Sequence, residues 1–155
     1  MTALVLPLFP LAVAGALLAL HRWPRALGAV AVGGLIATLA LGAWAAAVQP
    51  VAAWRWSGAI ELGLAVEGFA RVMVMLVPAI TAPIVAYAAA TQDEGHVRLL
   101  ALMLAFVGVM LLLVTAADFL TLLIAWELVG ALSWALIGHD WREPDSGASA
   151  AQAWK

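Results

Sequence analysis

The sequence contains no cysteine and few charged residues. The absence of cysteine excludes disulfides, cysteine nucleophiles and thiolate-ligated iron–sulfur clusters from this chain. Charged residues make up 10% of the 155 residues and hydrophobic residues 66%, and the mean hydropathy is +1.08. An ordinary soluble domain carries about 25% charged residues. The composition therefore predicts an integral membrane protein, and we expect neither redox chemistry nor a cofactor in this chain.

The motifs of soluble enzymes are missing as well. The sequence has no glycine-rich phosphate-binding motif, no G-x-S-x-G turn and no basic patch suited to nucleic acid. The three histidines, His21, His96 and His139, fall in predicted loops without metal-binding spacing, so no metal site is expected. The function is therefore expected to depend on the membrane-spanning segments.

Five apolar runs are long enough to cross a bilayer, whose hydrocarbon core needs about 20 helical residues. They lie near residues 2–20, 26–48, 70–91, 98–117 and 119–138. The expected fold is an all-α membrane protein of about five transmembrane helices. Two of these helices fall in residues 1–48 and three in residues 70–138.

Residues 49–69 separate the second and third predicted helices. Apolar side chains alternate with smaller or polar ones over residues 60–66. A period of two predicts a short β-hairpin on the outer surface, with Trp54 and Trp56 at the level of the lipid headgroups. An irregular interfacial loop is the alternative.

The arginines predict the orientation of the chain. Arg22 and Arg25 follow the first predicted helix, whereas no basic residue precedes it. Because basic residues concentrate in cytoplasmic loops, we expect the N terminus outside a prokaryotic-type inner (plasma) membrane. Residues 139–155 are then a cytoplasmic loop and the start of a sixth helix, so we expect the chain to be the first part of something longer.

The second predicted helix carries a stripe of small residues. Gly34, Thr38, Gly42 and Ala46 are spaced four residues apart. Small residues at this spacing let another membrane helix approach closely. A chance pattern in a helix rich in alanine and glycine is the alternative.

Glu127 is the one charged residue in the last apolar run. It is the ninth residue counted from 119, which places it about 12 Å into a core about 30 Å thick. An acidic group at that depth costs about 2.5–3.5 kcal/mol unless it is protonated, paired or hydrated. Its helical neighbours include Gly130, Ala131 and Trp134, and the small ones leave room for water or another helix. We therefore predict an inward-facing, proton-exchanging carboxylate, with a structural hydrogen bond between helices as the alternative.

Asp118 precedes the last predicted helix, directly after two alanines. An aspartate there can accept hydrogen bonds from free N–H groups and is favoured by the helix dipole, so we predict a helix cap. Nine residues separate Asp118 from Glu127, which places the two carboxylates on opposite faces of a helix. A paired-carboxylate device is therefore not expected.

Two stretches resemble a known family. "TAADFLTLLIAWELVGALSWALIG" and the following "WREPDSGASAAQAW" resemble the N-terminal part of the antiporter-like membrane subunits of respiratory complex I, in particular chain L, or chain 5. The family's W-E-x-x-G element here reads Trp126, Glu127, Leu128, Val129, Gly130. "AVEGFA" resembles the family's Asp-Gly-Leu-Ser element with Glu67 replacing the aspartate, and Gln152 stands where the family commonly has lysine.

The resemblance implies a role for the chain and for its carboxylate. Glu127 would face a lysine on a later, broken helix in a proton half-channel, with Trp126, Gly130, Ala131 and Trp134 as supporting residues. The subunit would couple quinone reduction by NADH dehydrogenase to proton pumping. Implied partners are the other membrane subunits of a complex I-like assembly, the remaining half of the subunit and the lipid bilayer. The alternatives are a structural or assembly subunit, or part of a multisubunit Na⁺/H⁺ antiporter or membrane-bound hydrogenase.

Overall fold

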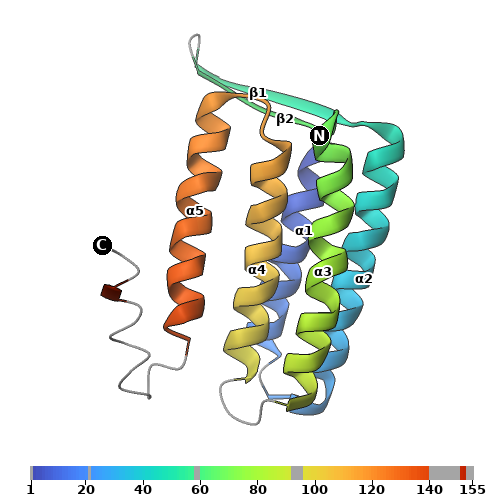
Figure 1. Cartoon of the computed structure of the whole chain (residues 1–155), viewed down its shortest axis with the longest axis vertical. Helices are drawn as coiled ribbons and strands as arrows, with labels where there is room; N and C mark the ends of the chain where they lie inside the picture. Colours follow the sequence, from blue (N-terminus) through green and yellow to red (C-terminus); the bar gives the residue numbers. More distant parts are fainter. Residues whose placement is uncertain (1, 21, 58–59, 92–95, 140–150, 153–155) are drawn as a thin grey trace.

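The computed structural model describes residues 2–20, 22–57, 60–91, 96–139 and 151–152 (Figure 1). Five helices lie side by side and a two-stranded hairpin crosses one end of the bundle. In chain order the elements are α1 (Thr2–Ala19), α2 (Pro24–Val48), β1 (Val51–Ser57), β2 (Ile60–Ala65), α3 (Phe69–Thr91), α4 (His96–Thr115) and α5 (Phe119–Ile137). The predicted all-α membrane fold with a small hairpin is confirmed. The predicted loop and sixth helix over 139–155 lie almost entirely outside the described residues.

Four of the described helices are long and apolar enough to cross a membrane. These spans are Ala26–Val48, Phe69–Thr91, Val97–Thr115 and Phe119–Ile137. The first predicted span also forms a helix of the bundle, but its apolar part, Ala3–Ala19, is shorter than the other four. The helix pattern thus follows the apolar runs of the sequence, because a backbone in lipid must satisfy its own hydrogen bonds.

Helix α4 occupies the middle of the bundle and contacts α1, α3 and α5 (Figure 1). The buried apolar cluster is built from α1, α2, α3 and α4, together with Val66. Its largest fully buried members are Leu17, Leu27, Leu35, Leu100, Leu104 and Leu111. Although α5 is described over its whole length, it adds no residue to this cluster. Helix α5 is therefore an edge helix.

The hairpin lies across the end of the bundle where α1 begins (Figure 1). Its strands are antiparallel and pair Val51 with Ala65 and Trp54 with Leu62. The period-two pattern therefore predicted the extended hairpin correctly. Trp54 is exposed, as predicted for a side chain at the level of the lipid headgroups. The side chain of Trp56, for which the same position was predicted, is not among the described atoms.

Helices α2 and α3 are in close contact at Gly42. A Cβ atom added to Gly42 would collide with the carbonyl oxygen of Val74. That carbonyl lies four residues before Pro78 inside α3, and proline has no N–H to donate to it. The Cα hydrogen of Gly42 instead points to this oxygen, the weak C–H···O contact that recurs between closely packed helices. Gly42 thus gives the Val74 carbonyl a weak hydrogen-bond partner in place of the N–H that Pro78 lacks.

The predicted stripe of small residues on α2 contacts two neighbouring helices, α1 and α3, rather than one. A Cβ atom added to Gly34 would lie 2.7 Å from a methyl group of Val13 in α1, whereas Gly42 meets α3. Residues spaced by four drift by about 40° at each step around a helix. Thr38, between the two glycines, is buried and donates its hydroxyl to the Gly34 carbonyl at 2.7 Å. The stripe therefore turns from α1 toward α3 along α2.

Replacing Gly42 by alanine should lower the free energy of unfolding by about 1–3 kcal/mol, because the new methyl group forces the α3 backbone away. Denaturant unfolding of the full chain in detergent micelles measures this. Gly33→Ala on the same helix is the matched control, since no described atom lies within 4 Å of its added Cβ. Equal stability losses in the two variants would contradict the proposed contact.

Candidate functional site

Glu127 lies at the middle of α5, on the side that faces away from the bundle. It is the ninth residue of the helix Phe119–Ile137. The buried residues of α5 are Thr121 and Ala125, on the side that contacts α4 and β2. Glu127 follows Ala125 by about 200° around the helix, and it is exposed. No described residue forms an ion pair or hydrogen bond with its carboxylate.

The inward orientation predicted for Glu127 was toward a lysine outside this chain, and it stays a prediction, because the described residues place Glu127 on the outer side of α5. Apart from Glu127, α5 is apolar around its whole circumference, so its apolar pattern does not distinguish the side that packs on α4 from the side that does not. The bundle uses the side of Thr121 and Ala125. The Glu127 side is left open to lipid or to another protein segment.

The residues predicted to support Glu127 lie on or beside this open side. Trp126 is 66% exposed and Trp134 is 45% exposed. Gly130 and Ala131 are exposed too, and no described atom lies within 4 Å of a Cβ added to Gly130. The described residues therefore leave the surface beside Glu127 accessible. We call the exposed residues Leu123, Trp126, Glu127, Gly130, Ala131 and Trp134 the open face of α5.

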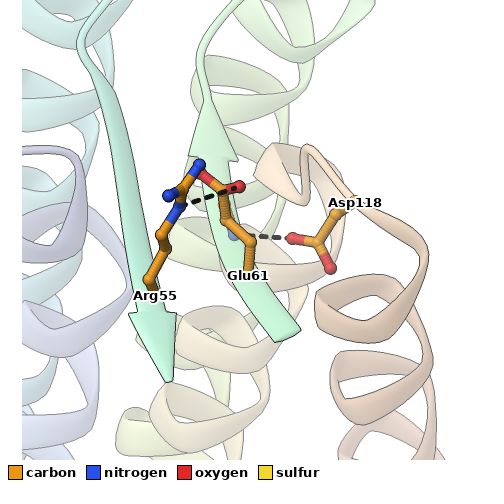
Figure 2. Close-up of polar contacts among 4 residues, drawn as sticks. Arg55, Glu61 and Asp118 are labelled. Carbon is orange, nitrogen blue, oxygen red and sulfur yellow. Dashed lines mark hydrogen bonds and ion pairs between the residues drawn. The ribbon is translucent and has the colours of Figure 1, made fainter. Parts of the chain in front are cut away.

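Asp118 caps α5 and also fastens the hairpin to it. One carboxylate oxygen accepts a hydrogen bond from the Thr121 N–H at 2.8 Å. The other accepts from the Thr121 hydroxyl and from the Gly63 N–H of β2, toward which Asp118 points in Figure 2. The Ala117 N–H in turn donates to the Gly63 carbonyl at 2.9 Å. The start of α5 is therefore bonded to β2 through both backbone groups of Gly63.

Gly63 is a residue that the sequence analysis did not single out. A Cβ atom added to it would lie 3.2 Å from the Ala117 Cβ and 3.4 Å from the Asp118 carboxylate. A side chain there would push the turn before α5 away from β2. The available signal was a glycine inside a short strand, which often marks the close approach of another backbone.

Hydrogen bonding keeps Asp118 ionised. Burial alone would raise the pKa of the Asp118 carboxyl, but bonds from the Thr121 hydroxyl and N–H and from the Gly63 N–H outweigh burial and hold this pKa below its ordinary value. The other charged contact of the hairpin, Arg55 with Glu61, is exposed and 3.9 Å long (Figure 2). Such a surface pair contributes about 0–1 kcal/mol. The Asp118 hydrogen bonds therefore stabilise this end of the bundle more than the Arg55–Glu61 ion pair does.

Nothing in the described part of the chain is arranged to hold a metal ion, since no three His, Asp or Glu side chains come together there. The chemistry that this arrangement can support is proton exchange at a carboxylate. Of the two carboxylates of this region, Glu127 is exposed without an ion pair among the described residues, whereas Asp118 accepts hydrogen bonds from Thr121 and Gly63.

Comparisons with known proteins identify relatives among quinone oxidoreductase subunits, although no protein-family model matches. The chain is 33% identical over 105 residues to NAD(P)H-quinone oxidoreductase subunit 5, chloroplastic, of Lemna minor. It is 32% identical over 109 residues to NADH-quinone oxidoreductase subunit L of Escherichia coli (strain K12). These matches cover 64% and 68% of this chain but only 14% and 18% of the two relatives. The predicted resemblance to the chain L and chain 5 type is confirmed, for a chain that spans less than a fifth of those relatives.

The Asp118 hydrogen bonds predict how stability depends on pH. Because the pKa of Asp118 is lowered by folding, its contribution is present above the unfolded pKa of about 3.9 and is lost as pH falls through the folded pKa. Asp118→Asn should reduce the free energy of unfolding by about 1 kcal/mol near neutral pH, because the neutral amide accepts weaker hydrogen bonds than the carboxylate. This difference should shrink in strong acid, as measured by unfolding in micelles across a pH series.

Glu61→Gln is the control for this prediction, because it removes an exposed hairpin carboxylate that pairs with the exposed Arg55. Its pH dependence should follow that of the unaltered chain. Parallel pH curves for the unaltered chain and Asp118→Asn would show that the Asp118 bonds do not stabilise the fold.

Proposed function

We propose that this chain is part of a proton-translocating membrane subunit of a complex I-type NADH:quinone oxidoreductase, in which Glu127 exchanges protons within the membrane. The names of the relatives support the host complex. The observation that carries the proton role is an exposed carboxylate at the midpoint of a membrane-spanning helix, with no ion pair to any described residue.

The free-energy cost of an acidic side chain in the middle of a membrane-spanning helix argues that Glu127 has a function. Glu127 lies eight residues after Phe119, about 12 Å along a helix with a rise of 1.5 Å per residue. A lipid-facing acid at that depth costs about 2.5–3.5 kcal/mol. A second protein segment over the open face of α5 would remove most of this cost by supplying a cation or a water-filled path. Intramembrane acids of this kind commonly mark ion or proton pathways.

The proposed mechanism needs a cation that moves. A cation that approaches the Glu127 carboxylate stabilises its ionised form and promotes release of the proton. When the cation withdraws and the surroundings become dry, the neutral form is favoured and a proton is taken up. Gly130 and Ala131 leave the space in which such a partner, or transient water, would lie. Redox chemistry would take place in other subunits, and this chain would respond to it.

The proposed partners and location follow from the same arrangement. A segment carrying an intramembrane lysine would lie against the open face of α5, beside other membrane subunits of the complex. We further propose a prokaryotic-type plasma membrane with the hairpin end outside. Arg22, in the turn between α1 and α2, lies at the opposite end of the bundle from the hairpin, as basic cytoplasmic turns do.

Glu127→Gln tests the proton role, because the amide has a similar shape but cannot exchange a proton in the same way. In vesicles that contain the assembled complex, we expect redox-driven proton pumping to fall by at least about tenfold. Native electrophoresis should show unchanged assembly. Glu61→Gln, on the exposed hairpin, is the matched control and should pump normally. Unchanged pumping in Glu127→Gln would reject the proton role, and lost assembly would favour a purely structural role.

Gly130→Leu tests whether a protein segment covers the open face of α5. No described atom lies within 4 Å of the added Cβ, so thermal unfolding of the chain in micelles should be unchanged. Assembly of the complex should decrease, because the leucine occupies the space of the partner. Gly15→Leu adds the same bulk at another open position, on α1. If both variants assemble equally well, the open face of α5 is not a protein contact.

A further inference from the structure

An open groove runs along the surface of the bundle between α2 and α3, which lie side by side in Figure 1. Its volume is about 690 Å³, and its lining includes Leu39, Val72, Met75, Leu76 and Ala79, with Arg71 toward the hairpin end. From Arg71 to Ala79 it follows α3 for about 12 Å. Because α2 and α3 both cross the membrane, the apolar part of the groove lies at the depth of lipid acyl chains.

Among the described residues, Arg71 makes one hydrogen bond, at the end of this groove. Its Nε donates to the Ala46 carbonyl in the last turn of α2 at 3.0 Å. A guanidinium has five N–H donors, and no residue of the described chain accepts from the terminal nitrogens. Glu67, one turn earlier, forms no ion pair with it among the described atoms. Arg71 therefore presents an uncompensated positive charge at the edge of a membrane-spanning segment.

The two features together match one kind of ligand. A planar guanidinium binds phosphate oxygens through paired N–H donors, and an apolar groove below it accepts hydrocarbon. An arginine near a helix end extends toward the headgroup region of the bilayer. Because no carboxylate of the described residues pairs with Arg71, a headgroup with net negative charge is favoured over a zwitterionic one.

We propose that the groove between α2 and α3 binds an anionic phospholipid of the bilayer. The lipid phosphate contacts the terminal nitrogens of Arg71, and one acyl chain lies along Met75 and Ala79. This site is on a different surface from the open face of α5, and it does not depend on the proposed proton role.

The experiment is native mass spectrometry of the full chain in micelles that contain equal amounts of phosphatidylglycerol and phosphatidylcholine. The unaltered chain should retain phosphatidylglycerol preferentially. Arg71→Gln should lower this preference about fivefold, the effect of one basic residue near a membrane surface, whereas Arg71→Lys should keep most of it. Arg55→Gln is the matched control, because it removes an arginine from the same end that is already paired with Glu61.

Two further variants address the groove itself. Ala79→Trp should reduce retention of both lipids, since the indole fills the space of an acyl chain. A photoreactive residue in place of Leu76 should form adducts with lipid in native membranes. Equal retention of the two lipids by the unaltered chain, equal effects of Arg71→Gln and Arg55→Gln, or polypeptide adducts at position 76 would each overturn the proposal.

Discussion

Polar groups inside a bilayer need partners within the protein, because lipid tails offer none, and this constraint explains the described contacts of the bundle. The carbonyl of Val74, deprived of its usual donor by Pro78, is met by the Cα of Gly42. The buried hydroxyls of Thr38 and Thr115 donate to carbonyls of their own helices, those of Gly34 and Leu111. Glu127 departs from this rule in the described chain, and the proposed function starts from that departure.

The position of Glu127 depends on how α5 is held. Helix α5 adds nothing to the main apolar cluster, and it is attached through α4 along its length and through β2 at its start. At that start, Asp118 is bonded to Thr121 and to Gly63 of the hairpin. These contacts direct the Thr121 side of the helix to the bundle and leave the opposite side outward. A small hairpin far from the membrane centre thus helps to orient a carboxylate at mid-depth.

Local features were predictable because neighbouring residues create them. The length of each apolar run predicted the helices, the period of two over residues 60–66 predicted a strand, and the position of Asp118 before Phe119 predicted the cap. Contacts between distant residues were not predictable. Gly63 and Asp118 are 55 residues apart, and no local pattern indicates that the hairpin folds back over the turn before α5.

The sequence by itself determined that this is a membrane protein with a carboxylate in the middle of an apolar run, because composition and the position of Glu127 are properties of the chain alone. It did not determine the direction in which that carboxylate points. A helix that is apolar on every side has no preferred face of its own. Only the packing of Thr121 and Ala125 against the neighbouring elements chose that direction, because tertiary contacts are what distinguish one side of such a helix from another.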